Sequence, residues 1–169
     1  VWEDYNGIKE NYFNLYSAYK KAFSKILNFY RNKFKKVKFY ELMLSDTFGK
    51  NDNRLKIINV LRKNYKSNTK TKIISKNLFI NLLNVEDVVD AVVLISKKKI
   101  KPKKYLLKNP INFNINKIIQ KLNSSGLKKI KIKWLSNKLI KEKILSYSVL
   151  KSWKPTKSNI SDIIKIITN

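Results

Sequence analysis

Hydrophobic side chains recur along the chain at two different spacings, which predict an alternation of helices and strands. Within residues 14–35 they return every three or four positions, as on the core-facing side of an α-helix. These positions are Leu15, Ala18, Tyr19, Ala22, Phe23, Ile26, Leu27 and Tyr30. Residues 36–45 end in a continuous apolar run, and residues 129–135 alternate apolar residues with lysines, so both segments predict β-strands.

The remaining elements follow from the same two spacings. Further helices are expected at about 54–64, 88–95, 114–125 and 160–167. Asn84 or the Glu86-Asp87 pair can cap the second of these helices, and Asn114 or Asn116 can open the third. Short strands are expected at 71–74, 78–83 and 104–107, and loops at 1–13 and 45–52. Alternating strands and helices predict an α/β layered fold.

Tyr16 and Lys20 are the residues in this pattern that indicate chemistry. Residues four apart share one helix face, so the Lys20 ammonium can sit beside the Tyr16 phenol and favour its ionised form. Such a phenol can give and take a proton at an alcohol or sugar oxygen. The spacing also arises by chance in a chain rich in Tyr and Lys, and Tyr5 and Lys9 share it in a loop-like segment. The alternative interpretation is a solvated lysine beside a half-buried tyrosine.

The net charge of +27 adds the hypothesis of nucleic-acid binding, because basic surfaces attract phosphate backbones. However, only three of the 38 basic residues are arginines, the residue type suited to bidentate recognition of phosphates and bases. The lysines are spread along the whole chain, and Asn and Ile are also abundant, as an A/T-rich coding sequence produces. The charge therefore favours nonspecific attraction to polyanions over a dedicated nucleic-acid site.

Missing residue types and patterns exclude several kinds of site. The chain has no Cys and no His, which removes disulfides, thiolate metal sites and the usual general base, and is compatible with the cytoplasmic location that we expect. It has three glycines, too dispersed to form a Gly-rich turn that holds a dinucleotide pyrophosphate. No apolar run approaches the roughly 18–20 residues that span a bilayer, and no signal-peptide pattern opens the chain, so we expect no membrane association.

Five short motifs follow one another along nearly the whole chain. They are Trp2 with Tyr5-Asn6, residues 14–23 around the Tyr–Lys pair, residues 44–49 with Asn51-Asp52 and Arg54, residues 85–91, and Trp153-Lys154-Pro155. In their order and separations they resemble the C-terminal half of an extended short-chain dehydrogenase/reductase of the NAD-dependent epimerase/dehydratase type. Within that family the likeness is to nucleotide-sugar 4-ketoreductases.

The resemblance implies an oxidoreductase that acts on a nucleotide-activated sugar in surface-polysaccharide synthesis, with NAD or NADP as cofactor. Tyr16 would donate or accept the proton at the sugar oxygen, and Lys20 would bind the nicotinamide ribose. Tyr16 and Ser45 would also contact the cofactor.

The resemblance further implies that Asp46 and Thr47 contact the substrate at the carboxyl edge of the sheet, where α/β folds place ligands. Arg54 is a candidate for contact with the nucleotide phosphates, and its alternative interpretation is a solvated residue at a helix start. Asp87 would be structural, as a cap of its own helix, and Trp153 would serve in packing.

The architecture implied is the C-terminal part of a Rossmann-like parallel sheet plus a small α/β substrate-binding region. Residues 1–104 would form the C-terminal half of the Rossmann-like domain, and residues 105–169 mainly the substrate-binding region. The family's dinucleotide-binding half would precede Trp2, so we expect a fragment that is inactive alone. Relatives often dimerise through the helix with the Tyr–Lys pair, which predicts a homodimer through residues 14–35.

Two other hypotheses remain open from the sequence. One is a basic RNA- or ribosome-associated binding protein, to which the charge would contribute. The other is a catalytically inactive or truncated relative that is kept for assembly.

Overall fold

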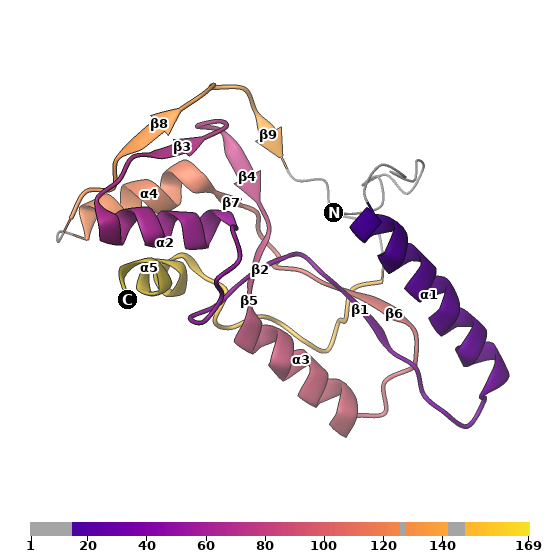
Figure 1. Cartoon of the computed structure of the whole chain (residues 1–169). Helices are drawn as coiled ribbons and strands as arrows, with labels where there is room; N and C mark the ends of the chain where they lie inside the picture. Colours follow the sequence, from indigo (N-terminus) through magenta and orange to yellow (C-terminus); the bar gives the residue numbers. More distant parts are fainter. Residues whose placement is uncertain (1–14, 126–127, 142–147) are drawn as a thin grey trace.

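The computed structural model describes residues 15–125, 128–141 and 148–169 (Figure 1). The described helices are α1 (Leu15–Lys33), α2 (Ile57–Ser67), α3 (Val85–Lys97), α4 (Ile115–Ser124) and α5 (Ile160–Thr168). The described strands are β1 (Glu41–Leu44), β2 (Asp46–Phe48), β3 (Thr71–Ile73), β4 (Leu78–Ile80), β5 (Leu82–Asn84), β6 (Lys104–Leu107), β7 (Phe113–Asn114), β8 (Ile132–Trp134) and β9 (Ile140–Lys141). This alternation of strands and helices confirms the predicted α/β class.

Most of the strand pairs are parallel. β1 pairs with β6, β2 with β5, β3 with β8 and β4 with β9 in parallel, while β4 and β7 are antiparallel. The register places Leu44 opposite Leu107 and Phe48 opposite Asn84. Because parallel strands end at the same edge, residues that follow β1 and β2 lie where α/β folds place ligands.

Two clusters of buried side chains form the interior. The large core joins α2, α4 and α5 with the strands around them, and α5 packs against both α2 and α4 (Figure 1). The small core lies between α3, β1 and β6 and includes Leu150 and Trp153. Strand β5 contributes to both, since Leu82 faces the large core and the next residue, Leu83, faces the small core. This alternation follows from the two-residue period of a strand.

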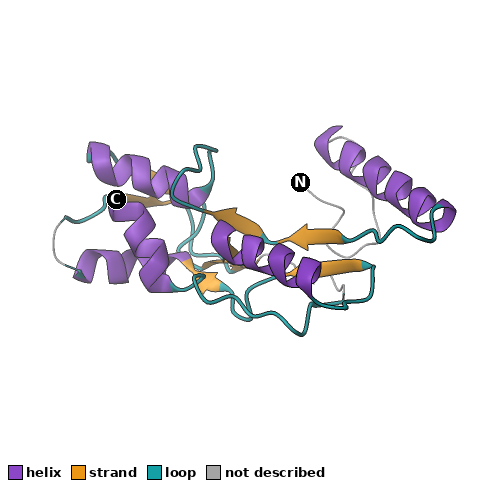
Figure 2. Ribbon diagram, turned by 90° about the horizontal axis from the view of Figure 1, so that it is seen from below, coloured by secondary structure: helices purple, strands orange, loops and turns teal. Residues whose placement is uncertain are grey.

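Helix α1 is present where the sequence predicts it, but its apolar face is not core-facing within the described structure. None of its described side chains is buried, and Figures 1 and 2 show it at one side of the molecule, apart from the other helices. The Ser24 hydroxyl donates to Glu41 Oε2 at 3.1 Å, which attaches the helix to β1. The expected burial is therefore wrong for this face, because no described segment covers it.

Two expected elements differ in the structure. The predicted loop at 45–52 contains strand β2, because Phe48 is buried in the large core and β2 pairs with β5. The predicted strand at 78–83 divides at Asn81, whose buried side chain hydrogen-bonds to the backbone of Asn109 and Ile111. In both places a contact distant in sequence overrides the local pattern.

Asparagines cap the helices at two of the expected positions. The Asn84 side chain accepts from Glu86 N and caps α3, and Asn114 accepts from Lys117 N and caps α4. Asp87 is not the cap of its own helix, because its carboxylate accepts hydrogen bonds from Thr156 and Lys157 instead. Its expected structural role is retained with different partners.

The predicted loop at 1–13 and its motif residues Trp2, Tyr5 and Asn6 lie outside the described residues, as does Asn14. Within the part described, no helix combines the length and apolar character that a membrane span requires.

Candidate functional site

The first turns of α1 bring Tyr16 and Lys20 together as their spacing predicts. Lys20 Nζ lies 5.4 Å from the centroid of the Tyr16 ring, within the range of a cation–π contact. Tyr16 is 55% exposed, so its ring remains accessible from solvent. Tyr147 and Lys151 have the same spacing, but Tyr147 lies outside the described residues, as do Tyr5 and Lys9.

Ser45 directly follows strand β1 and carries a buried hydroxyl. Its backbone N–H donates to Leu107 O at 3.1 Å, which extends the pairing of β1 with β6. Its Oγ has no hydrogen-bond partner among the described residues. A buried hydroxyl without a partner is costly, so this atom suits a ligand that supplies a hydrogen bond.

The next predicted residues form one polar cluster at β2. Arg54 Nη2 donates to Thr47 Oγ1 at 3.0 Å, and Lys56 Nζ forms an ion pair with Asp46. The guanidinium also makes a two-pronged contact with Asp52, from Nε to Oδ1 at 2.8 Å and from Nη2 to Oδ2 at 2.7 Å. Asp46, Thr47 and Arg54 are thus brought together, on a strand and the segment before α2.

The ionised side chains of Arg54 and Asp52 stabilise each other's charge. The side-chain hydrogen bond from Arg54 lowers the pKa of Asp52 to about 2. The same bond raises the pKa of Arg54, with smaller Coulombic contributions from Asp52, Asp46 and Tyr16.

Arg62 also belongs to the site, although the sequence pattern does not single it out. Its guanidinium donates to the carbonyl oxygens of Lys50 and Asp52, the latter at 2.7 Å. Two of the three arginines of the chain therefore hold the loop around Asp52. The scarcity of arginine is the signal that could have identified Arg62 from sequence.

A cavity of about 320 Å³ lies beside Arg54. It is lined by Phe48, Gly49, Asn51, Asp52, Arg54 and Val85. A Cβ atom at Gly49 would lie 2.7 Å from Val85 Cγ1, so glycine permits the close approach of this loop to α3.

The polar groups of the site suit the binding of an anion or another polar ligand. Arg54 Nη1 makes no hydrogen bond to a described residue, so this half of the guanidinium can still donate. The part of the chain that the structure describes contains no group of three or more His, Cys, Asp or Glu side chains that could hold a metal ion.

The parallel strand pairs, the covering helices and the polar site at the strand ends define a Rossmann-like α/β protein. The sequence model of the NAD dependent epimerase/dehydratase family matches residues 3–108, and the chain belongs to this family. No curated protein matches the chain significantly in sequence.

Solved structures of similar fold come from several organisms. UDP-glucose 4-epimerase from Thermotoga maritima, solved with UDP-glucose, is 15% identical, with a TM-score of 0.66 over 88% of this chain and 50% of that chain. dTDP-glucose 4,6-dehydratase from Bacillus anthracis, in complex with NAD, is 14% identical, with a TM-score of 0.69 over 90% and 51%. RMD from Pseudomonas aeruginosa, complexed with NADPH, is 14% identical, with a TM-score of 0.64 over 85% and 50%.

These likenesses confirm the Rossmann-like fold class that the sequence predicts. The chain spans about half the length of the solved structures that it matches.

Proposed function

We propose that the chain is part of an NAD- or NADP-dependent oxidoreductase of the epimerase/dehydratase type that acts on a nucleotide-activated sugar. The observation that supports this most directly is the contact between Lys20 Nζ and the Tyr16 ring. Membership of the NAD dependent epimerase/dehydratase family supports the cofactor class and does not favour an RNA-associated protein.

In this proposal the bound cofactor would supply the hydride chemistry, and the protein residues would bind and orient the cofactor and the sugar. Lys20 and Ser45 would hold the cofactor, Lys20 through its ammonium and Ser45 through its unpartnered buried hydroxyl. Tyr16 Oη would pass a proton to or from the sugar oxygen, and the Lys20 ammonium lies over the Tyr16 ring, 5.4 Å from its centroid.

Asp46, Thr47 and Arg54 bind the nucleotide-sugar in the same proposal. Asp52 orients the Arg54 guanidinium and Thr47 accepts from it, so its Nη1 side can meet a phosphate oxygen. Among the reactions of the class, we favour 4-keto reduction or epimerisation, as in CDP-abequose synthase-like ketoreductases.

We further propose that the dinucleotide-binding half is not contained in these 169 residues. The chain matches about half of each solved structure, and its glycines are too dispersed for a Gly-rich turn. Residues 1–104 would then complete a Rossmann-like domain, and residues 105–169 would form mainly the substrate-binding region. Turnover would require the complete enzyme.

The test is Tyr16→Phe in the complete enzyme, with steady-state turnover and nucleotide-sugar binding measured together. Loss of the proton donor should lower turnover roughly 10²–10⁴-fold and leave binding largely unchanged. Tyr19→Phe is the matched control, because Tyr19 lies on the same helix and is also exposed. Wild-type turnover in Tyr16→Phe would refute the assignment of the catalytic residue.

A further inference from the structure

A polar network joins three segments that pass between the large and the small core. The segments are residues 81–84, 109–112 and 156–158. Asn109 connects them, because its backbone N–H donates to Asn81 Oδ1 at 2.8 Å and its Nδ2 donates to Ser158 O at 2.6 Å. Asn81, Asn109 and Ser158 are all buried, so these bonds are protected from water.

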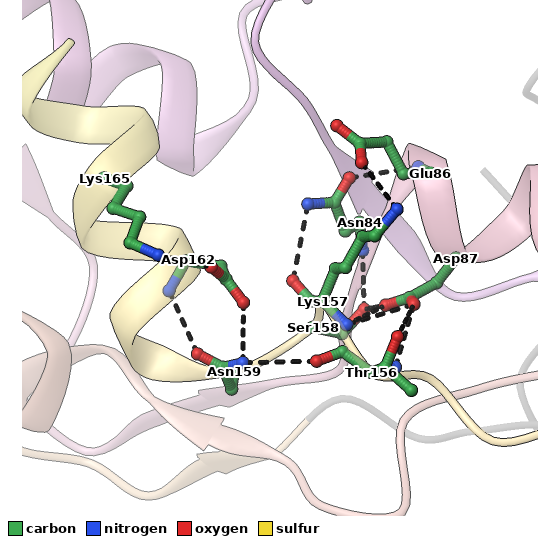
Figure 3. A network of polar contacts seen from close by, with 9 residues as sticks. All are labelled: Asn84, Glu86, Asp87, Thr156, Lys157, Ser158, Asn159, Asp162 and Lys165. Carbon is green, nitrogen blue, oxygen red and sulfur yellow. Dashed lines mark hydrogen bonds and ion pairs between the residues drawn. The ribbon is translucent and has the colours of Figure 1, made fainter.

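Asp87 anchors one end of the network at the start of α3. Its carboxylate is almost fully buried and accepts from Thr156 N at 2.8 Å, from Lys157 N at 3.0 Å and from the Ser158 hydroxyl (Figure 3). Its backbone carbonyl accepts from Trp153 Nε1 at 3.1 Å. A carboxylate can be buried only where donors replace water, so the 156–158 segment and Asp87 depend on each other.

Ser158 extends the anchor to the cap of α3. Its Oγ donates to Asp87 and accepts from Asn84 N at 2.8 Å. One hydroxyl thus ties the segment leading into α5, a helix of the large core, to the first turn of α3, a helix of the small core. Glu86 is different, because its ion pair with Lys157 at 2.9 Å lies at the surface.

We infer that Asp87 and Ser158 are positioning residues that fix the orientation of the large core relative to the small core. The site residues are divided between these cores, since Ser45 follows β1 of the small core and Arg54 precedes α2 of the large core. The network would therefore set the separation of the cofactor and substrate contacts. This last consequence rests on the proposed function, whereas the orientation itself does not.

The test measures the distance between the two cores directly. Lys97→Cys on α3 and Lys121→Cys on α4 place spin labels at exposed positions, and the full chain has no cysteine of its own to interfere. Electron–electron double resonance then gives the label-to-label distance distribution in the doubly labelled chain, in Asp87→Asn and in Ser158→Ala. Glu86→Gln is the control, because it changes the neighbouring residue and removes only a surface ion pair.

The labelled parent and Glu86→Gln should each give one narrow peak in the distance distribution. In Asp87→Asn and in Ser158→Ala this peak should broaden or split into several. Circular dichroism and the unfolding temperature confirm that each variant is folded.

If Asp87→Asn does not fold, the distance distribution of Ser158→Ala alone decides the test. A lower unfolding temperature with an unchanged peak would show a role in stability only and overturn the inference, as would unchanged peaks in both variants. No enzymatic readout is involved, so this failure is distinct from failure of the proposed function.

Discussion

Hydrogen-bond partners decide what individual residues do in this protein. The sequence groups Asp46, Thr47 and Arg54 by their place after a strand, and the structure connects Thr47 to the Arg54 guanidinium while Asp46 forms an ion pair with Lys56. Asp52 orients that guanidinium, although the sequence gives it no role beyond its place in a motif with Asn51 and Arg54. A side chain's type is visible in the sequence, but the partner that orients it is not.

The Asp52 carboxyl should titrate with a midpoint near 2, because the Arg54 hydrogen bond stabilises its charged form. Its folded pKa lies below the ordinary 3.8, so the stability that it contributes is present above about pH 4 and is lost as the pH falls towards 2. In Arg54→Gln the midpoint should rise towards 3.8, as followed by carboxyl ¹³C shifts. Lys56→Gln, which removes the partner of Asp46, should leave it nearly unchanged. An unaltered midpoint in Arg54→Gln would contradict the coupling.

At the scale of secondary structure, the spacing of apolar residues predicts where the helices lie better than it predicts whether their apolar faces are buried. Helices α1 and α2 both carry apolar side chains at helical spacing, yet Leu61 of α2 is fully buried and no described side chain of α1 is. Strand β2 is missed because its pairing with β5 depends on residues more than 30 positions away. Spacing reports which residues share a face, and tertiary contacts decide whether that face is buried.

Leu61→Ala should lower the free energy of unfolding by about 2–5 kcal/mol, because it removes buried methyl groups and leaves a cavity in the large core. Leu55→Ala makes the same chemical change at a residue that is 89% exposed, and should have almost no effect. Denaturant unfolding of the two variants gives the comparison. Equal losses of stability would mean that α2 does not pack on α5 as described.

At the scale of the whole molecule, helix α1 exposes an apolar face that no described segment covers. Tyr19, Phe23 and Ile26 on this helix are each about half exposed or more. Helical faces of this kind normally bury against another element. The homodimer through α1 that the family resemblance implies would cover such a face, and it remains a proposal.

If α1 mediates that homodimer, Phe23→Ser should weaken self-association by about 2 kcal/mol, or roughly 30-fold, because an interface aromatic is lost. Lys25→Ser changes an exposed residue of the same helix and serves as the control. Sedimentation velocity over a range of concentrations measures both. A monomeric parent chain, or an unchanged dimer in Phe23→Ser, would argue against α1 as the interface.

The sequence by itself determined the α/β alternation, the helical segments and the shared face of Tyr16 and Lys20, because these depend on spacings within a few residues. Only the tertiary structure decided that residues 46–48 form a strand. It also decided that Asp87 holds a segment some 70 positions later in the chain. These features depend on burial and on hydrogen bonds between distant segments, and such bonds leave no periodic signal in the residues that make them.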